Sequence, residues 1–132
     1  MRGASALQQT LERNPAIRLR VFVVWEPVIL TDVAPPTSGT LALISDPRAR
    51  QYWDEDRALS KEIIRAILAN PGRYSFSADI AEDTVVWDTV ALFQQGATWE
   101  NELPVPAYYG APVVDSVEGL RDALSKLGEP AP

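Results

Sequence analysis

The sequence of 132 residues predicts a single α/β domain in which a small mixed sheet is flanked by helices. Three stretches support this prediction. Residues 17–25 (IRLRVFVVW) alternate apolar and basic residues and then become apolar throughout, as in a strand that runs from solvent into a core. Residues 54–69 place Ile63 and Ile67 on an apolar stripe at helical spacing. Residues 84–93 (TVVWDTVALF) are rich in β-branched and aromatic side chains, which favour strands.

The other segments complete the expected order of elements. A first helix at residues 4–13 ends at Asn14 and Pro15, because the residue before a proline disfavours helical geometry. A proline-rich loop follows the first strand at residues 26–38. We expect short helices at residues 39–44 and 47–52, a short strand at 112–115, and a closing helix at 117–127 that Gly128 ends. The domain is expected to span residues 1–128, with a tail at 129–132.

Two residue types are absent, and their absence excludes several kinds of chemistry. Without cysteine the chain has no disulfide, thiolate nucleophile or iron–sulfur ligand, and without histidine it has no Ser-His-Asp triad. We therefore expect no catalytic residue, and the acidic runs lack calcium-loop spacing, so we expect no metal and no cofactor.

The charge balance and hydropathy limit the expected partners and location. Eighteen acidic and twelve basic residues give a net charge of −6, which argues against a nucleic-acid partner. There is no apolar run of membrane-spanning length and no signal peptide, so the chain as given is expected to be cytoplasmic and to have no membrane partner. If the true start lies upstream of Met1, we expect an exported protein instead.

The stretch ALQQTLERNPAIRLRVFVVWEPV resembles the first helix and the following strand of thioredoxin-like and peroxiredoxin-like domains. The resemblance covers most of the chain, since residues 84–93 correspond to an antiparallel third core strand and residues 117–127 to the closing helix. It implies a thioredoxin-like fold. The redox motif of the family, Cys-x-x-Cys, has no counterpart here, and no redox residue of the family is carried over to this chain.

The resemblance also implies a missing strand. In this alignment the chain begins at the helix after the strand that normally precedes the cysteines, so the fold is truncated at its N-terminus. Three alternatives follow: a start upstream of Met1, a sheet completed by a second copy or a partner strand, or direct pairing of residues 17–25 with residues 84–93. We expect direct pairing, with dimerisation as the next alternative.

One group of possible binding residues lies beyond the first strand, where open α/β sheets place their ligands. Trp25 and Glu26 form a pocket rim in this interpretation, with Asp32 nearby on the loop. The simpler interpretation is a strand end at which Trp25 packs on a helix. The simpler interpretation is favoured.

Further possible binding residues are aromatic and acidic neighbours. In one interpretation of Tyr52-Trp53-Asp54 the two aromatic rings stack on a ligand; in the other, Trp53 fills the core and Asp54 caps a helix. Trp87 and Asp88 lie in the predicted strand, where an inward Asp88 would join Glu26 in a two-carboxylate site.

The segment VPAYYG contains Tyr108 and Tyr109, which are predicted either to form a protein interface or to fold back on the domain. Three functions are therefore open, in this order of preference. The first is a non-catalytic thioredoxin-like domain that acts through a protein partner or homodimer. The second is a truncated thiol-disulfide oxidoreductase with its cysteines upstream, and the third is a small-molecule binding module.

Overall fold

The structure is a computed structural model that describes residues 2–29, 31–74 and 81–128; the predicted tail at 129–132 lies outside the described residues. The chain is mixed α/β, as the sequence predicts. In chain order the elements are α1 (Arg2–Arg13), β1 (Val21–Trp25), α2 (Ser38–Leu41), β2 (Ala49–Trp53), α3 (Ala58–Ala69), β3 (Val90–Leu92), β4 (Tyr108–Gly110), the 3-10 helix η1 (Val113–Asp115) and α4 (Val117–Gly128).

The strands form two small sheets. β1 and β2 run parallel, in a register that pairs Val21 with Ala49 and Trp25 with Trp53. β3 and β4 run antiparallel. The expected direct pairing of residues 17–25 with residues 84–93 is therefore wrong, because β1 takes β2 as its partner.

The partner strand was missed because residues 47–52 were expected to be helical. In the structure Ala49–Trp53 is a strand in which Arg50 and Tyr52 are exposed and the residues between them are half-buried. That alternation has the period of a strand with one covered face. Pro47 is compatible with the start of a helix, but it also fits the turn that leads into a strand.

Two other predicted strands differ from the structure. Residues 113–115 form a 3-10 turn, in which Asp115 N–H donates to Pro112 O at 3.1 Å, so the strand at 112–115 is wrong. The predicted strand at 84–93 is reduced to Val90–Leu92. Asp88 interrupts it, since its φ of 46° lies in the left-handed region, which cannot continue a strand.

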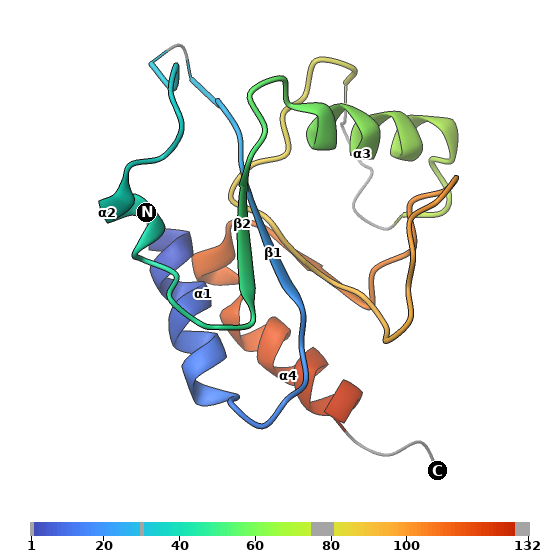
Figure 1. The fold of residues 1–132 in the computed structure, drawn as a ribbon. Helices are drawn as coiled ribbons and strands as arrows, with labels where there is room; N and C mark the ends of the chain where they lie inside the picture. Colours follow the sequence, from blue (N-terminus) through green and yellow to red (C-terminus); the bar gives the residue numbers. More distant parts are fainter. Residues whose placement is uncertain (1, 30, 75–80, 129–132) are drawn as a thin grey trace.

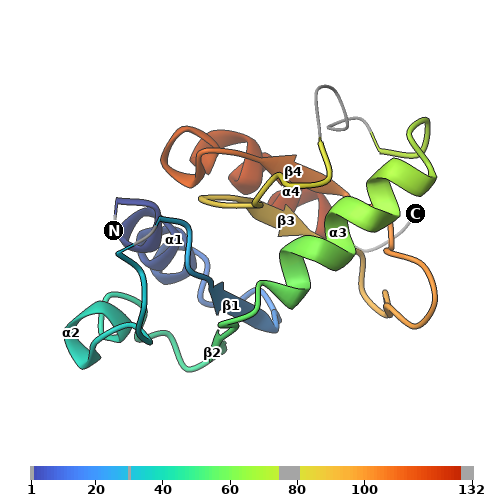
Figure 2. The same ribbon diagram turned by 90° about the horizontal axis from the view of Figure 1, so that it is seen from above.

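The helices lie on both sides of the strands (Figures 1 and 2). α1 and α4 lie side by side on one side, and α3 lies on the other. Ile64 and Ile67 are buried on the inner face of α3 and confirm the predicted apolar stripe there. Other buried hydrophobic side chains join the core from the remaining elements and loops: Leu11, Ile44, Tyr74, Leu103, Val113, Leu120 and Leu124.

Arg48 ties the end of α1 to the start of β2. Its guanidinium donates to the carbonyl oxygens of Leu11, Asn14 and Ile17 at 2.8, 2.8 and 2.9 Å. Leu11 O and Asn14 O each also accept one backbone bond, from the Asn14 and Ile17 amides, so Arg48 gives these carbonyls a second partner where the helix itself supplies none. The same side chain also pairs with Asp46 at 2.8 Å, which fixes its direction.

Candidate functional site

The carboxyl ends of β1 and β2 bring four of the predicted binding residues together. Trp25 and Trp53 are register partners, and Glu26 and Asp54 are the residues that follow them. The Asp54 N–H donates to Trp25 O at 2.9 Å, so the ladder extends one step beyond the strands. Two carboxylates therefore leave the same edge of a parallel sheet, as proposed for a site at this position.

Glu26 is engaged by the first turn of α3. Its carboxylate accepts from the Ser60 N–H at 3.1 Å and from the Ser60 hydroxyl at 2.5 Å. The Ser60 hydroxyl oxygen in turn accepts from the Val86 N–H at 3.1 Å. Because the first amides of a helix have no partner within it, a carboxylate from another element can serve as their acceptor. Glu26 therefore links β1, α3 and the segment before β3.

Asp54 caps the same helix from β2. Its Oδ2 accepts from the Leu59 N–H at 2.8 Å. Burial acts to raise the pKa of Asp54, but the Leu59 and Ala58 amides, the neighbouring Glu26 carboxyl and the Lys61 charge outweigh it, so that pKa is lowered. Both carboxylates are thus held by amides of the α3 N-terminus. This arrangement supports the interpretation of Asp54 as a helix cap. The Glu26 and Asp54 carboxylates connect the ends of β1 and β2 to the first turn of α3, and we call this connection the joint.

Trp25 is also held within the molecule. Its indole N–H donates to Gln51 Oε1 at 3.0 Å. The Gln51 amide nitrogen donates to the carbonyl oxygens of Leu41 and Ile44, both at 2.9 Å. Trp25 therefore belongs to a hydrogen-bonded chain that joins β1, β2 and the end of α2, and Gln51 at its centre was not predicted from the sequence.

Asp32 and Asp88 do not join this group. Asp32 Oδ2 accepts from the Val28 and Ile29 amides at 3.0 and 3.1 Å, which closes its own loop. Asp88 lies against α1, because a Cβ built on Gly3 would meet Asp88 Oδ1 at 2.2 Å. The two-carboxylate site of Glu26 and Asp88 is therefore not formed.

Trp87 and the two tyrosines differ in exposure. The Trp87 side chain is 65% exposed. Tyr108 instead packs on α4, where its hydroxyl donates to Ser116 O at 2.9 Å and its ring lies over Gly119. Tyr108 and Tyr109, both half-buried, line a cavity of about 590 Å³ next to the Arg73–Tyr74 segment. The inward orientation of Tyr108 favours the interpretation in which this ring folds back on the domain.

One surface was not predicted from the sequence. Phe22, Val24, Arg50 and Tyr52 point to the same side of the β1–β2 sheet, because paired residues of parallel strands share a face. We call these four residues the aromatic face. The Phe22 and Tyr52 rings lie 6.3 Å apart between centroids, and the side chains are 64% and 52% exposed. The residues of ARQYW alternate in exposure in the folded strand, but they alternate only weakly in hydropathy, so the sequence carries little signal for this surface.

Within residues 2–29, 31–74 and 81–128, no cluster of three side chains of metal-ligating types could hold a metal ion. None of the helices described there has both the length and the apolar character needed to cross a membrane. Comparisons with protein-family models, with curated proteins and with solved structures give no match.

Proposed function

We propose that the chain is a non-catalytic domain that associates with a second copy of itself through the aromatic face. The observation that carries this proposal is the exposure of two adjacent rings, Phe22 and Tyr52, on one side of a two-stranded sheet. Neighbouring exposed aromatic side chains are costly to hydrate, and aromatic residues are enriched at the centres of protein interfaces. Burial of both rings between two copies would remove this cost.

The aromatic face is chemically suited to a copy of itself. Arg50 is exposed on the same face as the two rings. A guanidinium over an aromatic ring is attracted to it, so the face carries both halves of a favourable cation–aromatic pair. In a two-fold dimer each Arg50 can lie over a ring of the other copy, and the pair is then made twice.

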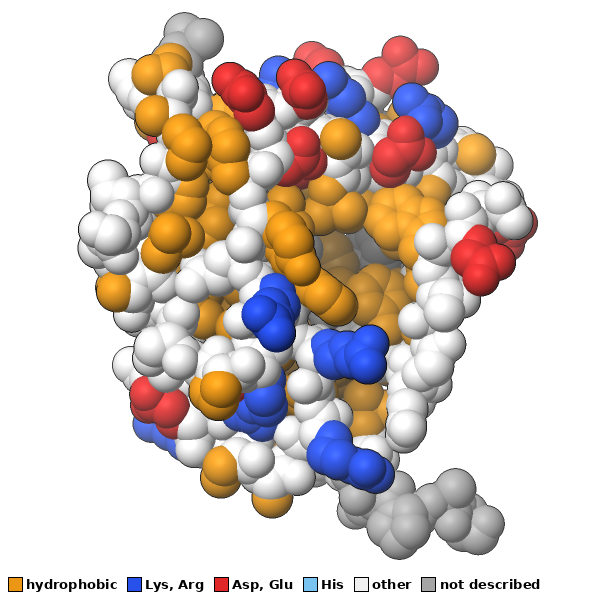
Figure 3. Space-filling view, viewed as in Figure 1, with side chains coloured by type: hydrophobic (Ala, Val, Ile, Leu, Met, Phe, Trp, Pro, Cys, Tyr) orange, Lys and Arg blue, Asp and Glu red, His pale blue; other side chains and the backbone are white. Residues whose placement is uncertain are grey.

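The charge around the aromatic face also favours a second copy. The chain has a net charge of −6, so two copies repel one another in most orientations. Arg18 and Arg20 are exposed just before β1, and Arg50 is exposed opposite Phe22. Figure 3 shows Lys and Arg side chains gathered over the part of the molecule where β1 begins. The local positive charge lowers the repulsion between copies that approach through this surface.

The small size of the sheet adds a further argument. In the described part of the chain, β1 and β2 have only each other as ladder partners. An isolated pair of strands is marginally stable in water, and its free edges can accept further strands. Association would therefore stabilise the sheet as well as cover its aromatic side chains.

The thioredoxin-like resemblance enters this proposal as a non-redox form of that fold. Support comes from the order of elements, in which the antiparallel strands β3 and β4 precede a closing helix, α4. The alternative of a thiol oxidoreductase has less support, because this chain contains no cysteine. The alternative of a small-molecule site at Trp25, Glu26, Trp53 and Asp88 also has less support, because Ser60 of α3 already binds the Glu26 carboxylate and Asp88 lies against α1.

Sedimentation velocity over a wide concentration range tests the proposal. We expect the wild-type chain to form a dimer as concentration rises, and Tyr52→Ser to shift the dimerisation to concentrations at least about tenfold higher. The matched control is Leu68→Ser, which removes a 41% exposed apolar side chain on α3 and should leave dimerisation unchanged. A monomeric wild type at every concentration, or equal effects of the two variants, would refute the proposal.

A further inference from the structure

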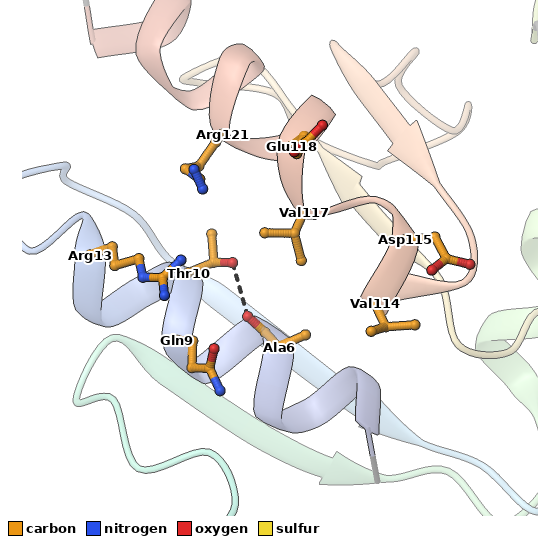
Figure 4. Close-up of a pocket in the computed structure, with 9 residues that line it drawn as sticks. All are labelled: Ala6, Gln9, Thr10, Arg13, Val114, Asp115, Val117, Glu118 and Arg121. Carbon is orange, nitrogen blue, oxygen red and sulfur yellow. Dashed lines mark hydrogen bonds between the residues drawn. The ribbon is translucent and has the colours of Figure 1, made fainter.

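A groove runs between α1 and α4 (Figure 4). Its volume is about 400 Å³. We call it the α1–α4 groove, and its lining residues come from α1, from η1 and from the first two turns of α4: Ala6, Gln9, Thr10, Arg13, Val114, Asp115, Val117, Glu118 and Arg121.

Arg121 has an unsatisfied donor in this groove. Its Nε is buried, and no hydrogen-bond acceptor lies within reach of it in the described part of the chain. A guanidinium stays charged at all physiological pH values, so it cannot lose the proton to escape this situation. A buried donor without an acceptor costs on the order of 1–3 kcal/mol, and more when the group is charged. The Nε of Arg121 is closed off from solvent, so an acceptor oxygen of a ligand reaches it only when the guanidinium turns toward the groove.

Arg13 faces the same groove from α1. Figure 4 shows the guanidinium of Arg13 turned toward Thr10, with that of Arg121 on the opposite wall. Among the described residues, neither arginine takes part in a salt bridge. Two unneutralised guanidinium groups thus face one groove, although the chain as a whole carries an excess of acids.

The carboxylates of the groove do not neutralise these charges. Figure 4 shows Asp115 at the far end of the groove and the Glu118 carboxylate directed away from the Arg121 guanidinium. Between the acidic and basic ends the groove is lined by the apolar side chains of Ala6, Val114 and Val117. The groove therefore offers a cationic end next to a small apolar wall.

We infer that the α1–α4 groove binds a small organic anion whose carboxylate or phosphate group lies between Arg13 and Arg121. Guanidinium groups pair with such oxyanions through directed, charge-assisted hydrogen bonds, and an Arg121 guanidinium that turns toward the ligand would also gain an acceptor for its buried Nε. The apolar wall favours a ligand with a short hydrocarbon or aromatic portion, and the modest volume excludes a large one. This site does not depend on the proposed association of the aromatic face.

Calorimetric titration at constant ionic strength tests this inference, with benzoate as the carboxylate probe and phenyl phosphate as the phosphate probe. We expect saturable binding of one ion per chain by at least one probe, and the tighter of the two identifies the preferred anionic group. Arg121→Gln and Arg13→Gln should each weaken that binding about tenfold or more, because each removes one guanidinium.

The control is Arg65→Gln, which removes an exposed arginine of α3 outside the groove and should leave the affinity unchanged. Arg13 is exposed, so its variant remains informative if Arg121→Gln fails to fold. The inference is overturned if neither probe binds the wild type with a dissociation constant below about 10 mM, or if Arg65→Gln weakens binding as much as Arg13→Gln.

Discussion

Arg48 holds both carboxylate oxygens of Asp46: its Nε donates to Oδ1 at 2.9 Å and its Nη2 donates to Oδ2 at 2.8 Å. The remaining donors of the same guanidinium reach three carbonyl groups at and beyond the end of α1. The two side chains are 18% and 8% exposed, so solvent screens this pair only weakly. One planar side chain therefore fixes the position of α1 relative to the start of β2.

Arg48→Lys should destabilise the fold although it keeps the charge. An ammonium group cannot form the two-pronged contact with Asp46 and also reach three carbonyl groups. We expect a loss of about 2 kcal/mol in the free energy of unfolding, measured by urea denaturation. Arg65→Lys is the control, because its ion pair with Glu62 is exposed, and it should change the stability by less than about 0.5 kcal/mol. Equal effects of the two substitutions would contradict the role given to Arg48.

Stability should fall in acid, and Asp46 should account for part of the loss. The hydrogen bond from Arg48 lowers the pKa of Asp46 and outweighs its burial, and the pKa of Asp54 is also lowered. As the pH falls, the carboxylates of Asp46 and Asp54 therefore take up protons at a higher pH in the unfolded chain than in the folded chain. The stabilisation is complete above about pH 5, and is lost progressively as the pH falls through the lowered values.

Urea denaturation between neutral pH and about pH 3 measures this dependence. In Asp46→Asn the free energy of unfolding should be lower at neutral pH. It should also fall less steeply as the pH decreases, because the variant has no carboxylate at position 46 that can take up a proton. A slope in the variant as steep as that of the wild type would contradict the assignment to Asp46.

Ser60→Ala should loosen the joint between α3 and the strand ends. The hydroxyl donates to Glu26 and accepts from the Val86 N–H, and Ser60 is 2% exposed. Its removal leaves a carboxylate oxygen and a backbone amide with one partner fewer, which should cost about 1–3 kcal/mol. Ser125→Ala is the control, because that exposed hydroxyl bonds only to a carbonyl of its own helix. A change within experimental error for Ser60→Ala would show that this joint does not contribute to stability.

Gly119→Ala should be destabilising, although alanine favours helices by about 1 kcal/mol over glycine. A Cβ at this position would lie 2.7 Å from the Tyr108 ring and hydroxyl oxygen, which are fixed by the bond to Ser116. We expect a loss of about 1–3 kcal/mol in thermal or urea unfolding, because the ring must move from its site on α4. Gly72→Ala is the matched control, since nothing lies within 4 Å of its Cβ. A gain in stability for Gly119→Ala would contradict the packing described for Tyr108.

The elements with long apolar periodicity were predicted from the sequence. The stripe along α3 and the faces of α1 and α4 repeat at helical spacing, and the apolar run before Trp25 indicates β1. β2 was missed because its five residues contain Arg, Gln and Tyr, whose alternation is weak in hydropathy and visible only once one face is covered. Pro47, which precedes β2, is compatible both with the start of a helix and with a turn, so it does not distinguish the two.

The candidate site shows the same limit at the level of single residues. The positions of Glu26 and Asp54 in the sequence do not show that α3 lies at the ends of both strands. The same two acidic residues are therefore compatible with a structural joint and with a binding site. Gln51 and Arg48 carry no motif, because their role depends on carbonyl groups that tertiary folding brings to them. Asp88 was placed in a strand, and its left-handed backbone cannot be predicted from composition.

Photo-crosslinking from the aromatic face shows whether two copies of the chain associate through it. The chain with p-benzoylphenylalanine in place of Phe22 is mixed in equal amounts with a ¹⁵N-labelled chain that keeps Phe22, irradiated at high micromolar concentration, and digested for mass spectrometry. Self-association through the aromatic face predicts joined peptides of one light and one heavy member, with the heavy member from β1 or β2. Crosslinks confined to light peptides of the same chain, or mixed peptides that map away from β1 and β2, would contradict it.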